Sequence, residues 1–224
     1  MSKTGFNVLL DLDGTLTDSE QGILRSMRHA LQMMNRPSQD DVALRKLIGP
    51  PTRIAFERLL GSDDRALVDT CVAHYRERFA RVGLYENRLY PGIGELLDGL
   101  RALGCTLFLA TSKPLVYARR IVEHFAIDRY FAGLYGAGLD GMHADKGELI
   151  RHLLTTERLD ASRCLMVGDR RHDVLGARAN GVAVCGVRWG YGDAEELRVA
   201  APDFQCERPA DLLAIVRRQA SMRG

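Results

Sequence analysis

Short apolar runs divide the chain and predict buried β-strands. Five such runs lie at Phe6–Leu10, Thr106–Ala110, Phe131–Tyr135, Cys164–Val167 and Ala183–Val187. Segments with helical spacing of apolar residues lie between them, at Ile93–Leu103, Val116–Phe125, Lys146–Thr156 and Asp173–Asn180. Continuous apolar runs are typical of strands buried on both faces, and strands that alternate with helices form βαβ units. The pattern therefore predicts an α/β fold, an open parallel, Rossmann-like sheet with helices on both faces.

One segment, from Ser19 to about Arg88, departs from this alternation. It contains no convincing strand, only amphipathic helical patterns such as the stripe of Leu24, Met27, Leu31 and Met34. A helical stretch of roughly 70 residues is far longer than a usual crossover connection. We therefore predict an all-helical cap domain over residues 18–88, inserted into an α/β core domain formed by residues 1–17 and 89–224.

The amino-acid composition limits the classes of binding partner that we expect. The 224 residues are 46% hydrophobic, and 31 basic residues oppose 29 acidic ones without forming a basic tail or stripe. This argues against binding to a nucleic acid polymer. No apolar stretch approaches the ~20 residues that a membrane span requires. Five cysteines without a C-x-x-C spacing indicate a reducing compartment, and the first residues carry no signal-peptide pattern, so we expect a cytoplasmic protein.

The string Asp11-Leu12-Asp13-Gly14-Thr15-Leu16-Thr17-Asp18 directly follows the first predicted strand. Ligands of open α/β sheets bind at the carboxyl ends of the strands. Asp11 and Asp13 are two residues apart and face the same way in extended backbone. Crowded carboxylates repel each other unless a cation or a proton relieves them. An ordinary Asp-Gly turn before a helix is the structural alternative, and the full eight-residue string favours a binding site over it.

A second acidic pair, Asp169 and Asp173, follows the run Cys164–Val167. Its spacing of four residues places both acids on one face of a helix that starts there. Asp173 by itself could serve only to complement the helix dipole. Together with Asp11 and Asp13, however, four acids gather at two strand ends of one sheet. Carboxylate oxygens are the ligands that Mg²⁺ prefers, so the sequence predicts a magnesium site.

Two further segments could bind an anion. Thr111-Ser112-Lys113-Pro114 follows the run Thr106–Ala110, and hydroxyl and amide groups at a helix start can cradle a phosphate. A plain helix cap with proline in the first turn is equally compatible with these residues. Lys146 opens the next helical run. A lysine at a helix start is more often a surface residue, but its position near a positive dipole end suggests a compensating anion. The chain contains just four lysines, at positions 3, 46, 113 and 146, and two of them fall in these segments.

Along the chain these four elements follow in the order Asp11–Asp18, Thr111–Pro114, Lys146 and Gly168–Asp173. In this order they resemble the haloacid dehalogenase superfamily, and in particular its phosphoglycolate phosphatase-like and nucleotidase-like members. The resemblance covers nearly the whole chain, with the helical cap inserted after the first motif. It rests on D-x-D-G-T at residues 11–15 together with G-D-x-x-x-D at residues 168–173. Ala-Asp-Lys-Gly-Glu around Lys146, and Arg170-Arg171-His172 in the second acidic motif, are more similar to the nucleotidase-like branch.

The resemblance implies a Mg²⁺-dependent phosphatase that hydrolyses a small phosphorylated metabolite, phosphoglycolate or a nucleoside monophosphate, through an aspartyl-phosphate. Asp11 would be the nucleophile and Asp13 the general acid and base, and the catalytic set also includes Thr111 and Lys146. The phosphate would be bound by Leu12, Asp13, Thr111, Ser112 and Lys146. Mg²⁺ would be held by Asp11, the backbone carbonyl of Asp13, Asp169 and, in support, Asp173.

Two other activities fit parts of this pattern. A sugar-phosphate mutase of the same superfamily would protect its aspartyl-phosphate from water. A receiver-like signalling switch also combines an acidic cluster, a phosphorylated aspartate, a Thr or Ser and a Lys. Receiver domains lack a large helical insertion, and Asp13-Gly14-Thr15 argues against them. We expect a monomer or a weak homodimer.

Overall fold

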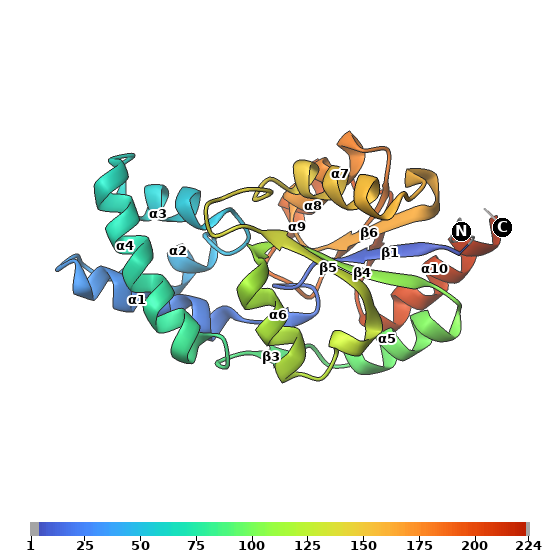
Figure 1. Cartoon of the computed structure of the whole chain (residues 1–224), viewed down its shortest axis with the longest axis horizontal. Coiled ribbons are helices and arrows are strands. Elements are labelled where there is room, and N and C mark those ends of the chain that lie inside the picture. Colours follow the sequence, from blue (N-terminus) through green and yellow to red (C-terminus); the bar gives the residue numbers. More distant parts are fainter. Residues whose placement is uncertain (1–4, 223–224) are drawn as a thin grey trace.

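The computed structural model describes residues 5–222, and the side chains of residues 5–219. Residues 1–4 and 223–224, which the predicted core domain includes, lie outside the described part. Six parallel strands form the main sheet in the order β5-β4-β1-β6-β7-β8 (Figure 1). They are β1 (Asn7–Leu10), β4 (Thr106–Pro114), β5 (Phe131–Ala137), β6 (Cys164–Gly168), β7 (Ala183–Val187) and β8 (Phe204–Cys206). The predicted open parallel sheet is confirmed.

Helices cover both faces of this sheet because side chains alternate along each buried strand. Leu10 and Val167 pack into one apolar cluster, whereas Leu9 and Met166 pack into another. The first cluster includes residues of α5 (Ile93–Ala102), α6 (Leu115–His124) and α10 (Pro209–Met222). The second includes residues of α7 (Lys146–Glu157), α8 (Arg171–Ala179) and α9 (Ala194–Ala200). Figure 1 shows α7 and α8 above the sheet, with α5 and α6 below it.

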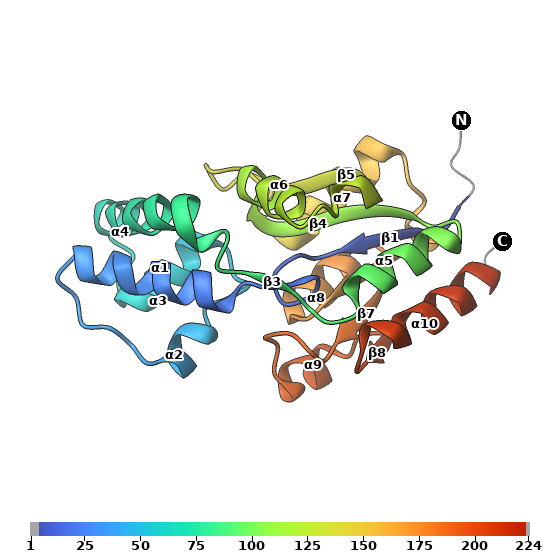
Figure 2. The ribbon, with the colours of Figure 1, turned by 90° about the horizontal axis from the view of Figure 1, so that it is seen from below.

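The segment that follows β1 is helical, apart from a short ribbon at its two ends. It contains α1 (Glu20–Met33), α2 (Asp41–Arg45), α3 (Thr52–Leu60), α4 (Arg65–Arg78) and a π-helical turn that continues α4 (Phe79–Gly83). These helices gather beside the core, at the left of Figures 1 and 2. Strand β2 (Thr17–Asp18) pairs antiparallel with β3 (Arg88–Leu89), so the chain enters and leaves the helical segment at one place. This pairing supports the predicted cap boundaries at residues 18 and 88, which remain a prediction.

The backbones of α1 and the π-helical turn touch where two glycines face each other. A Cβ on Gly22 would overlap the carbonyl oxygen of Gly83. Ser26 is part of the same contact, because its Oγ donates to the carbonyl of Gly22 at 2.7 Å and accepts from Arg78 at 3.1 Å. The close approach holds α1 against the end of α4, and so fixes these two cap helices relative to each other.

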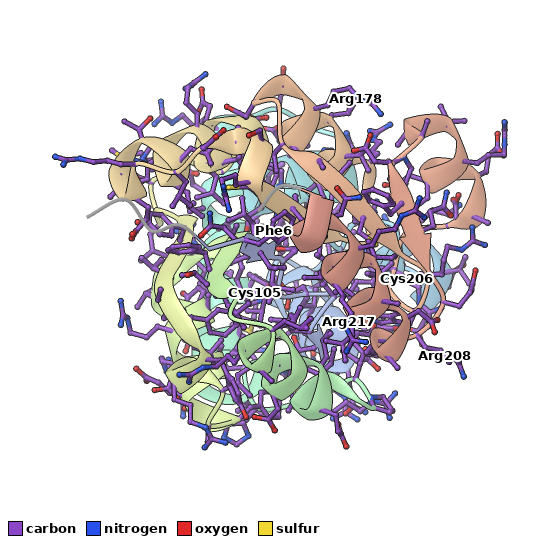
Figure 3. All side chains as sticks on the ribbon, turned by 90° about the vertical axis from the view of Figure 1, so that its right-hand side faces the viewer. Phe6, Cys105, Arg178, Cys206, Arg208 and Arg217 are labelled. Carbon is purple, nitrogen blue, oxygen red and sulfur yellow. The ribbon has the colours of Figure 1, made fainter. Side chains whose placement is uncertain are left out.

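The amino ends of the strands lie at the end of the molecule that faces away from the helical segment. Figure 3 views that end and shows Phe6, directly before β1, and Cys105, directly before β4. The carboxyl ends of the strands therefore point toward the cap helices, where an open α/β sheet binds its ligand. No helix within residues 5–222 is long and apolar enough to cross a membrane.

Candidate active site

Three of the four predicted metal ligands meet at the carboxyl ends of two neighbouring strands. Asp11 follows β1 and Asp169 follows β6, and these strands are paired in the sheet. Asp173 lies in the first turn of α8. One carboxylate oxygen from each of these residues lies within 4.8 Å of the others, and all three residues are buried. The sheet topology thus assembles an oxygen-only donor set of the kind that suits a divalent cation such as Mg²⁺.

Asp169 is the member of this carboxylate cluster that a bound cation would stabilise most directly. Its Oδ2 accepts hydrogen bonds from the backbone amides of Tyr191 at 2.7 Å and Gly192 at 3.2 Å. Its Oδ1 is buried with no hydrogen-bond partner among the described residues. Burial, reinforced by the nearby carboxylates of Asp173 and Asp11, raises the pKa of Asp169 to about 8. A cation ligated by Oδ1 would satisfy that atom and relieve the repulsion, so these residues fit the predicted metal.

The loop after Asp11 passes directly beside Asp169. Gly14 has a φ of +83°, which favours glycine, and a Cβ there would overlap the Asp169 carboxylate. The backbone around Asp13 is therefore close to the metal cluster, where the family resemblance expects the Asp13 carbonyl to be a ligand. The Asp13 side chain is not part of the carboxylate cluster.

Lys146 supplies the cation that the structure itself places among the acids. It opens α7, as predicted, and is 4% exposed. Its Nζ lies 3.0 Å from Asp11 Oδ1 and 2.8 Å from Asp173 Oδ1, and donates to the carbonyl of Ala110 at 2.9 Å. Burial opposes the charged form, but the attraction of the two carboxylates outweighs it and raises the pKa of Lys146. The ammonium is therefore charged throughout the physiological pH range and holds Asp11 in place.

The Asp11 carboxyl shows the opposite balance. Burial raises its pKa, against the attraction of the Lys146 ammonium. The repulsion of Asp173 and Asp13 acts in the same direction as burial. Additional positive charge at the cluster would favour the ionised form that a nucleophile requires.

Asp13 is held by two donors that sequence reasoning did not assign to it. Its Oδ2 lies 2.5 Å from Lys113 Nζ, and its Oδ1 accepts from Ser19 Oγ at 2.6 Å. Lys113 is itself 9% exposed, and its Nζ lies 4.7 Å from the centre of the Phe79 ring, which belongs to the cap. Ser19 precedes α1 without capping it through its side chain. The candidate acid–base residue is thus tied to both the core and the cap.

The segment Thr111-Ser112-Lys113 differs in local structure from its prediction. We expected a helix start at these residues, but β4 continues through Pro114 and α6 begins at Leu115. The pairing of β4 with β5 shifts register between Thr111 and Pro114, which marks an irregular strand end. Thr111 is buried and its Oγ1 accepts from the amide of Lys113 at 3.2 Å. A strand end, and not a helix dipole, therefore presents Thr111 and Ser112 to the cavity.

A cavity of about 70 Å³ joins these residues to the cap. Asp11, Asp13, Thr111, Ser112 and Lys146 line it on the core side. The cap contributes an apolar wall of Ile23, Met27, Leu47, Ile48, Ala55, Phe56, Tyr75 and Phe79. Leu12, predicted to bind phosphate, is not among the lining residues, and its side chain is fully buried in the core.

Two arginines join cap and core at the edge of this cavity, and sequence reasoning missed both contacts. Arg170 Nη1 donates to the carbonyl oxygen of Ile48 in the cap, while its Nε donates to Glu196 at 2.9 Å. In the reverse direction, Arg76 of α4 donates through Nη2 to the carbonyl oxygen of Leu139 in the core at 2.8 Å. Contacts to backbone carbonyls leave no signature in the sequence, because any residue type offers that acceptor.

Comparison with known proteins shows the relationship that the geometry suggests. Over 209 residues the chain is 51% identical to a Pseudomonas aeruginosa protein named 5'-nucleotidase, with 93% of each chain covered. It is 41% identical over 188 residues to a Mycobacterium tuberculosis protein named tyrosine-protein kinase PtkA, covering 84% of this chain and 64% of that protein.

Structural comparison gives the same result. The crystal structure of a predicted phosphatase from Clostridium acetobutylicum superimposes with a TM-score of 0.91 at 35% identity, covering 95% of this chain and 99% of that one. The family model described as haloacid dehalogenase-like hydrolase matches residues 8–187. That range begins in β1 and ends with β7, and it contains Asp11, Thr111, Lys146 and Asp169. The chain therefore belongs to the haloacid dehalogenase-like hydrolase family.

Proposed function

We propose that the protein is a Mg²⁺-dependent phosphatase that hydrolyses a small phosphomonoester through an aspartyl-phosphate on Asp11. The observation that carries the proposal is the position of Asp11, which is paired with Lys146 at 3.0 Å and lies within 4.8 Å of two further carboxylates. A nucleophilic carboxylate beside a fixed ammonium and a divalent-cation site matches what phosphoryl transfer requires.

In the proposed reaction, Asp11 attacks the phosphorus and the ester oxygen leaves. Asp13 protonates that oxygen, and later takes a proton from the water that attacks the aspartyl-phosphate. Ser19 and Lys113 donate hydrogen bonds to the two Asp13 oxygens and hold the side chain in place for both steps. Lys146, Thr111 and Ser112 stabilise the phosphoryl oxygens. A bound Mg²⁺ would supply the charge that lets a carboxylate approach a phosphate dianion.

The proposed substrate is a nucleoside monophosphate, and phosphoglycolate is the second candidate. The name of the relative that is 51% identical supports the first, and the aromatic residues Tyr75 and Phe79 in the cavity wall suit a planar base. Because residues of both core and cap line the cavity, we infer that the cap moves to admit the substrate and then closes over it.

Phosphate release from a panel of esters tests the proposal. The panel holds nucleoside monophosphates, phosphoglycolate, sugar phosphates and phosphotyrosine, each with Mg²⁺ and with EDTA. We expect Mg²⁺-dependent release that is abolished in Asp11→Asn and retained in Asp63→Asn, an exposed aspartate between α3 and α4. Isomerisation of a sugar phosphate without phosphate release would favour the mutase. Normal release by Asp11→Asn would refute the nucleophile. Membership of a hydrolase family argues against the receiver-like switch.

A further inference from the structure

Arg76 is a cation of the cavity wall that has no part in the proposed reaction. It lies on α4 of the cap and lines the same cavity as Asp11 and Lys146. Its Nη2 donates to the carbonyl oxygen of Leu139, which fixes the guanidinium against the core loop that follows β5. Its Nε is buried and has no hydrogen-bond partner within residues 5–219. The Arg76 side chain as a whole is only half-buried, so its guanidinium is open to an oxygen of a molecule bound in the cavity.

The other cations along the cavity already bond to carboxylates. Lys113 pairs with Asp13 and Arg170 pairs with Glu196. Lys146 pairs with both Asp11 and Asp173. Arg76 has no such carboxylate partner in the described part of the chain, although Arg78, two residues further on, pairs with Glu86. Its charge is therefore available to a bound molecule.

The position of Arg76 connects it to the leaving-group side of the reaction. Phe79 follows it by three residues, a spacing that puts both on one helix face. The Phe79 ring lies 4.7 Å from Lys113 Nζ, and Lys113 bonds to Asp13, the residue that would protonate the leaving oxygen. A group attached to that oxygen would extend away from the strand ends into the cavity, whose cap side includes Phe79 and Arg76.

We propose that Arg76 binds an acceptor oxygen of the leaving group, either a carboxylate or a carbonyl oxygen, and so sets the preference of the enzyme among phosphomonoesters. The proposal rests on the proposed phosphatase function and adds the residue that selects the substrate. The planar, permanently charged guanidinium suits such an oxygen better than a lysine would, and the Leu139 contact holds it ready.

Matched esters with and without the acceptor test this proposal. Uridine monophosphate and phosphoglycolate carry a carbonyl and a carboxylate oxygen, whereas phenyl phosphate and ethyl phosphate carry neither beyond the ester. The variants are Arg76→Met, Arg76→Lys and, as a control, Arg81→Met, an exposed arginine in the π-helical turn. We expect Arg76→Met to lower kcat/KM roughly tenfold to a hundredfold for at least one acceptor-bearing ester. Its kcat/KM for phenyl and ethyl phosphate should stay within about threefold of wild type.

The outcomes distinguish a failure of the Arg76 assignment from a failure of the phosphatase function. Selective loss with uridine monophosphate places the acceptor oxygen on the nucleoside, as a carbonyl contact requires, and selective loss with phosphoglycolate identifies a carboxylate. An equal loss on all four esters would show that Arg76 only fastens the cap to Leu139, and no loss on any ester would remove it from the site; either result overturns the proposal. Arg76→Lys, which keeps the charge, repeats the test should Arg76→Met not fold. Failure of the wild type to hydrolyse any ester would refute the phosphatase function itself.

Discussion

Replacing Asp169 by Asn should stabilise the metal-free protein at alkaline pH while abolishing its response to Mg²⁺. Asp169 is fully buried, next to the carboxylates of Asp11 and Asp173, and one of its oxygens lacks a partner. An asparagine can retain the acceptor for the amides of Tyr191 and Gly192 and place an NH₂ group toward the neighbouring carboxylates. The substitution thus removes a repulsive charge and keeps the local hydrogen bonds.

The size of the effect follows from the raised pKa. The pKa of Asp169 is about 8 in the folded protein, against 3.8 ordinarily. Between these values the folded protein keeps a proton that the unfolded chain releases, so this group lowers stability as the pH rises. Each pH unit lowers the free energy of unfolding by about 1.36 kcal/mol. Over the three units from pH 5 to pH 8 the loss reaches up to about 4 kcal/mol. For a chain of this length that is a difference in Tm of about 8–16 °C.

Thermal unfolding of wild type and Asp169→Asn at pH 5 and pH 8, with and without Mg²⁺, measures this effect. Without metal, the Tm of the wild type should fall relative to that of the variant as the pH rises. Mg²⁺ at pH 8 should raise the Tm of the wild type only. A variant that is less stable than wild type at pH 8 without metal would contradict the raised pKa of Asp169, and equal stabilisation of both proteins by Mg²⁺ would contradict the metal assignment.

Two further substitutions test the core of the site and the packing of the cap. Lys146→Arg should lower kcat/KM for phosphate release roughly a hundredfold although it keeps the charge. The larger, forked guanidinium cannot occupy the point where Nζ contacts Asp11 and Asp173. Near-normal turnover by this variant would refute the role of Lys146. Gly22→Ala should cost about 1–3 kcal/mol in the free energy of unfolding measured with urea, since its Cβ would overlap the Gly83 carbonyl. Gly94→Ala, in α5 with open space around the new methyl group, should be neutral or stabilising.

The fold was predictable where the chain repeats one pattern over several residues. Buried apolar runs marked five of the six strands of the main sheet, and helical spacing marked α5 to α8. Strand β8 contains three residues, of which Gln205 is exposed, so neither an apolar run nor an alternation of useful length is present. The ribbon of β2 and β3 has two residues per strand, and its existence depends on a contact between residues some 70 positions apart.

The site was predictable as a set of strand-end acids but not as a set of contacts. Asp11, Asp169 and Asp173 converge because the sheet order places β1 beside β6. The bond from Lys113 to Asp13 depends on the irregular end of β4, which appeared in the sequence as a helix start. The amides of Tyr191 and Gly192 that hold Asp169 are backbone groups, and backbone donors are present at every residue except proline.

Phosphorylation of Asp11 during turnover is tested most directly by trapping the phosphorylated protein. Wild-type protein mixed with Mg²⁺ and its best substrate, then quenched in acid within one turnover, can be digested and analysed by mass spectrometry. We predict a phosphoryl group on the peptide that contains Asp11, lost on treatment with base and absent from Asp11→Asn. A phosphoryl group on another residue, or turnover during which Asp11 is never modified, would contradict the account.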